Sequence, residues 1–301
     1  MLDAGEIGAK MNALDLWEVL MPFNWAVKPR GTAFPYFCSV LKGEKEPVRY
    51  RFLMIEGWQT LHDYIRTRID RNYGFYSTPS EMPHFELVAL TSGETRLFRH
   101  DPGYVPQELK PSPQRDLAAK ILWEAYGVML RLETDRKLPL KYADEKSVFA
   151  RVEGKDGVWS DEPLSIPDPP ALVEKVAFAK DDLKAAKDLP LHAGSALSLD
   201  FRLVPRLMTQ ETRPRCVYEL KAVDAVTGAL AFESRASADR DGGLKALWES
   251  MPAQVLKLLL KRGALPGEIK VCSGRVFRML RPLCIDLPFK LSLHDELPVL
   301  G

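Results

Sequence analysis

The chain has 301 residues, of which 46% are hydrophobic and 28% charged, a composition that favours about two folded domains over large-scale disorder. Its 42 basic and 41 acidic side chains almost cancel, which excludes the global positive field of a protein that holds nucleic acid mainly through phosphates. No apolar run approaches the roughly 20 residues that span a bilayer, and the N-terminus starts acidic and amphipathic. We therefore expect a cytoplasmic protein without membrane contact.

The first half of the chain predicts helices that alternate with pairs of strands. Apolar residues recur at helical spacing in residues 10–21, 56–72 and 114–133, which predicts three helices. Two hairpins are predicted at 34–55 and 84–100, because strand-like runs flank short polar turns. The last of the three helices carries a wide apolar stripe, which is typical of a helix that covers a sheet.

The second half repeats this alternation after Pro139. A hairpin is predicted around residues 155–157 and a helix over 170–186. A long helix is predicted at 243–262, in which Pro252 should introduce a kink or a break. The predicted strands are 195–204, 216–223, 229–234, 268–272 and 289–293, with a short helix at 274–283.

These elements predict an α+β or α/β fold of two lobes, residues 1–140 and 141–301. In each lobe we expect amphipathic helices to cover a sheet of mixed or antiparallel strands. No metal site is indicated, because the cysteines form no CxxC pair and the histidines never fall at i and i+4 with a neighbouring acid. We therefore predict neither a protein-built metal site nor a cofactor, and interpret the cysteines as buried free thiols. The cysteines are Cys38, Cys216, Cys272 and Cys284, and the histidines are His62, His84, His100, His192 and His294.

Two fragments recur in the same order and indicate an internal duplication. Phe85-Glu86-Leu87 is echoed by Tyr218-Glu219-Leu220, and AKILWEA further along is echoed by LKALWES. The alternative is that helices and strands facing a core converge on similar residues. If the duplication is real, Trp123 and Trp248 are equivalent core anchors.

Residues 195–293 have a distinctive order of strands, turn and helix. SLDFRLV places Asp200 on a first strand, AVDAVTGALAF forms a hairpin, and Cys272 follows a later strand. This order resembles the ribonuclease H-like fold of retroviral integrases and many transposases, which implies an acid both at Asp200 and at the position of Cys272. Two-metal phosphoryl transfer needs several carboxylates, and a thiol cannot replace one of them. The resemblance is therefore to a degenerate domain without its catalytic acids.

Asp200, Asp224 and Cys272 are weak catalytic candidates, and each has a simpler interpretation. Asp200 could be a strand-end carboxylate paired with Arg202 or Arg206. Asp224 precedes a tight turn, where an aspartate can bond its own backbone. Cys272 lies at a strand-to-helix junction, where a helix N-terminus could lower a thiol pKa, but a buried structural cysteine is the alternative because no histidine or acid lies nearby in sequence.

A second resemblance covers the same half of the chain. A hairpin with Asp and Thr-Gly is followed by a long helix, Gly-x-x-Pro-x-x-Ile-x-Val, a short helix and a terminal Leu-Pro. This pattern is similar to that of an uncharacterised bacterial family of unknown function, which implies a single domain here and no particular activity. The residues concerned are Asp224, Thr227, Gly228, Gly263, Pro266, Ile269, Val271, Leu297 and Pro298.

Residues 244–283 are locally cationic. They hold eight basic side chains against two acidic ones, and we take Lys261, Arg262, Arg275 and Arg278 as candidates for binding a phosphate or another ligand. The alternative is the ordinary solvated face of an amphipathic helix.

The sequence thus predicts a non-catalytic binding or scaffolding protein whose ligand is unknown. Its partner could be a protein, or a nucleic acid bound through the local basic patch. The alternative is a metal-dependent nuclease or transposase relative that uses Asp200 with acids from elsewhere in the fold, such as Asp224 or Glu233. A third hypothesis is a thiol enzyme at Cys272.

Overall fold

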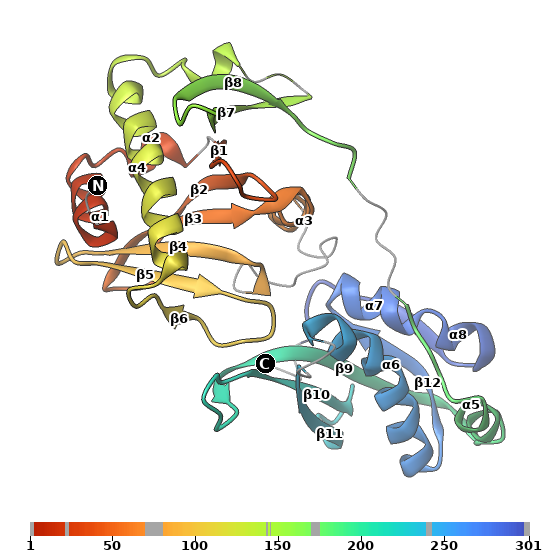
Figure 1. Cartoon of the computed structure of the whole chain (residues 1–301). Helices are drawn as coiled ribbons and strands as arrows, with labels where there is room; N and C mark the ends of the chain where they lie inside the picture. The colour runs from red at the N-terminus through yellow and green to blue at the C-terminus, as the bar shows by residue number, and fades with distance from the viewer. Residues whose placement is uncertain are drawn as a thin grey trace. The chain divides into compact units, whose positions relative to one another are not determined.

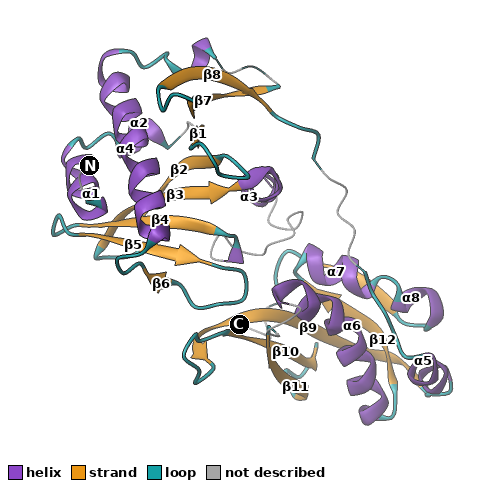
Figure 2. Cartoon of the chain, in the orientation of Figure 1, coloured by secondary structure: helices purple, strands orange, loops and turns teal. Residues whose placement is uncertain are grey.

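The chain forms two compact units, which we describe separately. The computed structural model describes residues 3–21, 24–69, 81–142, 144, 146–169, 175–238 and 243–297 (Figure 1). The first unit comprises Met1–Ile65, Pro79–Asp101 and Pro106–Pro170, and the second comprises Arg66–Thr78, Pro102–Val105 and Ala171–Gly301. Figure 2 shows helices and strands in both units. Because each sheet contains parallel and antiparallel pairs, the predicted mixed α/β class is confirmed.

An eight-stranded sheet is the framework of the first unit in the described part of the chain. Its order is β6-β5-β4-β3-β2-β1-β7-β8, and every neighbouring pair is antiparallel except β1 and β7. The hairpins predicted at 34–55 and 84–100 are present as β2–β3 and β4–β5. The strands are β1 (Trp25–Lys28), β2 (Tyr36–Lys42), β3 (Val48–Glu56), β4 (His84–Leu90), β5 (Thr95–His100), β6 (Gln107–Glu108), β7 (Ser147–Glu153) and β8 (Trp159–Ser165).

Helices lie on both faces of this sheet. α1 (Ala4–Ala13) and α4 (Pro113–Thr134) pack on one face, and their apolar residues share a core with Cys38 and Val40 of β2. Ser39, between those two residues, points to the other face because side chains alternate along a strand. There its hydroxyl forms a 2.8 Å hydrogen bond with the hydroxyl of Tyr64 on α3 (Gly57–Ile69). The helix predicted over 56–72 is therefore α3, and residues 70–72 lie outside the described range.

The N-terminal helix differs from the prediction over residues 10–21. The structure has two helices, α1 and the short α2 (Trp17–Leu20). α1 begins earlier than predicted because Asp3 and Glu6 form a capping box at its first turn. The break between the helices contains Asp15 in the left-handed conformation, with φ of 52°, which aspartate tolerates better than most residues.

The hairpin β7–β8 joins the sheet of the first unit. We predicted a lobe boundary at residue 140, which assigned this hairpin to the second lobe. In the structure β7 pairs in parallel with β1, with Ala26 opposite Ala150, and the first unit extends to Pro170. The difference arises because this pairing joins segments about 120 residues apart, and a local sequence pattern contains no information about such a partner.

The described part of the second unit contains a five-stranded sheet in the order β11-β10-β9-β12-β13. The strands β9, β10 and β11 are antiparallel neighbours, whereas β12 joins β9 in parallel and β13 joins β12 in parallel. The strands are β9 (Leu191–Met208), β10 (Cys216–Asp224), β11 (Leu230–Ser237), β12 (Leu265–Val271) and β13 (Lys290–Leu293).

The helices described for the second unit pack on a single face of this sheet. Their apolar residues share one core with Leu197, Leu199 and Phe201, the alternate residues of β9. Trp248 of α6 is 1% exposed and meets Phe201 edge to face at 4.8 Å. Trp123 of α4 is 41% exposed, so the two tryptophans are not the equivalent core anchors that a real duplication was expected to give. The helices are α5 (Lys180–Lys187), α6 (Gly243–Arg262), α7 (Gly274–Leu280) and α8 (Leu283–Asp286).

The long helix of the second unit has the predicted bounds, and one helix differs from the prediction. α6 is not split at Pro252, because the buried stripe on both sides, including Trp248 and Val255, holds the helix together. The helix predicted over 170–186 begins only at Lys180, and residues 170–174 lie outside the described range. No helix among the described residues is long and apolar enough to cross a membrane.

A short segment between β5 and β6, Pro102–Val105, belongs to the second unit. The N–H of Val105 donates to the carbonyl of Pro214 at 3.0 Å, and the N–H of Cys216 donates to the carbonyl of Gly103 at 2.9 Å. Tyr104 forms an isolated antiparallel bridge with Arg215. The segment therefore lies along the start of β10 as a strand-like neighbour.

Candidate functional site

One face of the second sheet lies opposite its helices and is lined by charged side chains. We call this surface the polar face. It presents the residues that alternate with the core positions of β9, β10, β11 and β12. Among the described residues, Leu297 covers a small part of it by packing against Val223 and Cys272. The polar face consists of Ser198, Asp200, Arg202, Glu219, Lys221, Glu233, Arg235, Glu268 and Lys270.

Asp200 lies near the centre of the polar face. Its Oδ1 accepts a 2.8 Å hydrogen bond from the backbone N–H of Phe201. Burial raises the pKa of its carboxyl, although the charge of Arg202 and this hydrogen bond act in the opposite direction. The side chain of Arg206, the other pairing partner that we considered, lies outside the described part of the chain.

Lys221 lies between Asp200 and Glu233 in the order of strands across the polar face. In the strand register Lys221 is opposite Asp200 on one side and opposite Glu233 on the other. Glu233 itself pairs with Arg235 at 3.0 Å. Asp200 and Glu233 are thus two strands apart, with a basic residue on the strand between them, which does not favour a divalent ion shared by the two carboxylates.

Asp224 has the predicted turn geometry. Its Oδ1 accepts hydrogen bonds from the N–H of Val226 at 3.0 Å and from the N–H and hydroxyl of Thr227 at 2.8 and 2.9 Å. These bonds, led by that from the Thr227 backbone, lower the pKa of Asp224, and the charge of Arg262 adds to the effect. The carboxylate is therefore engaged in holding the β10–β11 turn.

Cys272 follows β12 and precedes α7, whose N-cap is Ser273. Burial raises the pKa of its thiol, and the negative charge of Asp200 raises it further. This direction is opposite to the activation that the thiol-enzyme hypothesis requires, since a reactive cysteine has a lowered pKa. The protonated thiol is the form present at neutral pH.

The four basic candidates do not form a single exposed surface. Lys261 is exposed and Arg262 and Arg278 are half-buried, whereas Arg275 is only 3% exposed. The guanidinium carbon of Arg275 lies 3.8 Å from the ring centroid of Trp248, which is a cation–π contact at the core. Arg275 is therefore part of the packing of α7 against α6.

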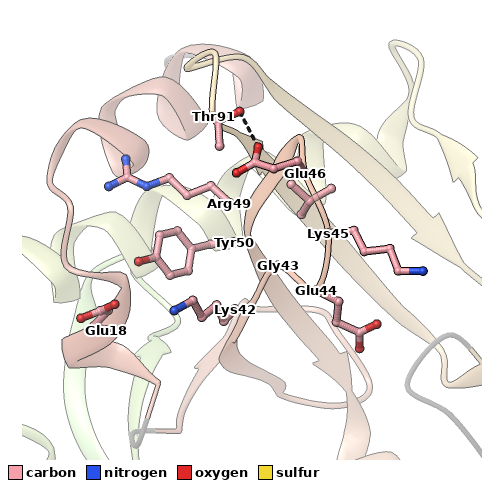
Figure 3. A pocket seen from close by; sticks show the side chains of 10 residues that line it. Glu18, Lys42, Gly43, Glu44, Lys45, Glu46, Arg49, Tyr50 and Thr91 are labelled. Carbon is pink, nitrogen blue, oxygen red and sulfur yellow. Dashed lines mark hydrogen bonds between the residues drawn. The ribbon is translucent and has the colours of Figure 1, made fainter.

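A depression of about 310 Å³ lies at the β2–β3 turn of the first unit (Figure 3). Its lining holds three basic and three acidic side chains, of which Arg49 pairs with Asp15 and Glu46 accepts a 3.1 Å hydrogen bond from Thr91. Because both charge signs are present and partly paired with each other, this depression selects for no particular ligand charge. The charged lining residues are Glu18, Lys42, Glu44, Lys45, Glu46 and Arg49.

A buried polar cluster lies on the α3 face of the first sheet. His84 and Glu86 are alternate residues of β4, and His100 of β5 is directly opposite His84. All three are between 1% and 3% exposed. Of all described residues, these three are the one group of His, Cys, Asp or Glu whose donor atoms lie close enough to hold a metal ion, within 4.8 Å of one another. We call this group the histidine cluster.

Hydrogen bonds fix the histidine cluster. His84 Nδ1 donates to the carbonyl of Met82 at 2.8 Å, and His100 Nε2 donates to Glu86 Oε2 at 2.6 Å. Arg51 of β3 donates to the other oxygen of Glu86. Burial is the main cause that lowers the pKa of His84 to about 3. Burial alone would raise the pKa of Glu86, but the hydrogen bonds from His100 and Arg51 outweigh it and bring the pKa to about 2.

Sequence reasoning missed the histidine cluster because it searched for helical i, i+4 spacing. The available signal was strand spacing: His84 and Glu86 at i and i+2 in a predicted strand, with His100 in the next strand of the same hairpin. Residues i and i+2 of a strand share a face, and a hairpin partner opposite them lies within about 5 Å.

The fold and these sites define a mixed α/β protein with two sheets. A family model described as a domain of unknown function, DUF6930, matches residues 182–301. The match is consistent with the resemblance of this half to an uncharacterised family. No curated protein and no solved structure matches the chain.

The residues that carried that family resemblance stand at structurally constrained positions. Gly228 closes the β10–β11 turn with φ of 71°, and Gly263 ends α6 with φ of 75°, a conformation that favours glycine. Ile269 and Val271 point from β12 into the core. Pro298 lies outside the described residues.

Proposed function

We propose that the chain is a non-catalytic binding or scaffolding protein whose second unit is a ribonuclease H-like domain without catalytic metal ions. The strand order supports the relationship. Three consecutive antiparallel strands, β9, β10 and β11, are followed by a long helix and then by β12, which returns to pair in parallel with β9. This is the order of elements on which the sequence resemblance rested.

The observation that carries the proposal is the surroundings of Asp200. Two-metal phosphoryl transfer places two ions about 4 Å apart, and each needs several oxygen ligands. Lys221 lies opposite Asp200 on the neighbouring strand β10. The charge of Asp200 raises the pKa of the Cys272 thiol. An ammonium group repels the hard cations that this chemistry requires, and a neutral thiol binds them only weakly.

The charge balance of the polar face favours a protein partner. Four of its side chains are basic and four are acidic, and several pair with each other, including Arg235 with Glu219 at 3.0 Å. Binding to nucleic acid depends on an excess of basic side chains on the protein surface that faces the phosphates. A surface of alternating charges instead matches a protein surface of complementary pattern.

The decisive experiment is a hydrolysis assay on single- and double-stranded DNA and RNA with Mg²⁺ or Mn²⁺. We expect no hydrolysis by the wild-type chain. Hydrolysis that Asp200→Ala abolishes and the matched control Asp295→Ala retains would overturn the proposal. Asp295 is a suitable control because it is an exposed acid of the same unit.

Nucleic-acid binding without hydrolysis is tested separately by fluorescence anisotropy with labelled oligonucleotides. We expect no binding at physiological salt. Binding whose affinity falls steeply with salt would show that phosphates are the ligand and would contradict the assignment of a protein partner.

A further inference from the structure

The histidine cluster contains two buried nitrogen atoms without a hydrogen-bond partner in the described part of the chain. They are Nε2 of His84 and Nδ1 of His100. A buried polar atom without a partner costs about 1–3 kcal/mol, so native structures rarely keep one without a reason. A group bound beside the two stacked rings would supply the missing partners.

The hydrogen bonds of the cluster leave both nitrogens as lone-pair donors. His84 uses the hydrogen on Nδ1 to bond the Met82 carbonyl, which leaves Nε2 as the acceptor of the neutral ring. His100 uses the hydrogen on Nε2 to bond Glu86, which leaves Nδ1 in the same state. A backbone carbonyl and a carboxylate are the outer groups that commonly orient metal-binding histidines.

The backbone holds the two rings close together. Their centroids are 4.1 Å apart and their planes differ by 19°, as expected for directly opposite residues of an antiparallel pair. The ligand atoms that the three residues of the cluster offer lie within 4.8 Å of one another, so one ion beside the rings can contact more than one of them after a small movement of the side chains.

Glu86 supplies a negative charge beside the two rings of the cluster. Its carboxylate accepts from His100 and is held on the other side by Arg51. One negative charge beside the rings offsets part of the charge of a bound cation, and the hydrogen bond to His100 holds that ring in one orientation.

We propose that His84 and His100 bind a first-row transition metal ion of the kind that prefers imidazole, such as Zn²⁺, Ni²⁺ or Cu²⁺, and that Glu86 positions His100 for this. Imidazole nitrogen is a preferred ligand of these ions, whereas Mg²⁺ and Ca²⁺ select oxygen. All three residues are almost completely buried, so an ion bound there is shielded from bulk solvent. This site belongs to the first unit and does not depend on the function proposed for the second.

The test uses the full chain, freed of metal by chelation and then titrated with Zn²⁺ in a calorimeter. We expect one ion per chain, a rise in melting temperature on binding, and loss of both effects in His84→Gln and His100→Gln. Glu86→Gln should weaken binding by about 10–100-fold, as for other outer-shell groups. The matched control is His192→Gln, which changes an exposed histidine of the second unit and should bind as the wild type does.

A spectroscopic measurement on the wild-type chain separates this site from the cysteines and does not depend on whether the variants fold. Co²⁺ in place of Zn²⁺ should give a spectrum of nitrogen and oxygen ligands without the charge-transfer band of a bound thiolate. Absence of stoichiometric binding, a thiolate band, or equal binding by a folded His84→Gln variant would each overturn the proposal.

Discussion

Replacing Trp248 and Trp123 by alanine should have very different effects on stability. Trp248 is 1% exposed, and its ring contacts Phe201 at 4.8 Å and the guanidinium of Arg275 at 3.8 Å. A fully buried aromatic side chain removes about 150–250 Å² from water, which at about 25 cal/mol per Å² corresponds to about 4–6 kcal/mol. Measured costs of tryptophan truncation in cores are about 3–5 kcal/mol. We therefore expect Trp248→Ala to lower the free energy of unfolding of the second unit by about 4 kcal/mol.

Trp123 provides the comparison because the internal duplication would make it the counterpart of Trp248. It is 41% exposed and its nearest aromatic partner, Tyr126, lies at 6.1 Å. With part of the ring already in water, Trp123→Ala should lower the free energy of unfolding of the first unit by about 2 kcal/mol. Trp248→Phe, which keeps an aromatic ring beside Phe201, should cost less than Trp248→Ala.

Hydrogen exchange measured by mass spectrometry is the appropriate assay, because the two units need not unfold in one transition. A loss of 4 kcal/mol speeds exchange by about three orders of magnitude, since each 1.4 kcal/mol is tenfold. In Trp248→Ala this effect should appear in peptides of α6 and β12. Equal effects of the two alanine variants on their own units would refute the packing argument and favour the duplication.

The other predictions concern ionisable groups. Cys272 should react slowly with iodoacetamide at neutral pH. Asp200→Asn should speed the reaction, because removing the negative charge lowers the pKa of the thiol. An unchanged rate in Asp200→Asn would contradict this reasoning. Burial, and then the charge of Glu56, raises the pKa of Tyr36 from 10.0 to about 12. Its contribution to stability is thus fully present below pH 10 and is lost as the pH rises to 12, by about 3 kcal/mol. Tyr36→Phe should remove this part of the alkaline loss in urea unfolding, and an identical pH profile of the two proteins would show that the ring is not buried as described.

Local patterns predicted most of the secondary structure of this chain. The hairpins around residues 92–93 and 155–157 and the apolar stripe of α4 depend on neighbours in sequence, and they appear where expected. The turn role of Asp224 was predictable for the same reason, since the groups that it bonds are within three residues.

The features that sequence reasoning missed depend on long-range partners. Because β7 pairs with β1, the β7–β8 hairpin belongs to the first unit and not to the second lobe as predicted. Nothing in residues 147–153 specifies that partner strand. Arg275 looked like a surface cation because its burial depends on Trp248, which is 27 positions earlier in the chain. The histidine cluster depends on the register of β4 against β5. The alternation of apolar and polar residues suggests which residues share a face, but the strand pairing determines which of them are opposite each other.

The segment Pro102–Val105 bears on how the second unit can be isolated. Its backbone bonds Pro214 and Cys216, and Arg213 stacks over the ring of Tyr104 at 4.1 Å. The family match begins at residue 182, far beyond this segment. A fragment cut at residue 171 or 182 would leave the backbone groups at the start of β10 exposed as an open strand edge, which is a known route to aggregation. Recombinant work on this domain should therefore retain the whole chain or supply residues 102–105 by a designed connection.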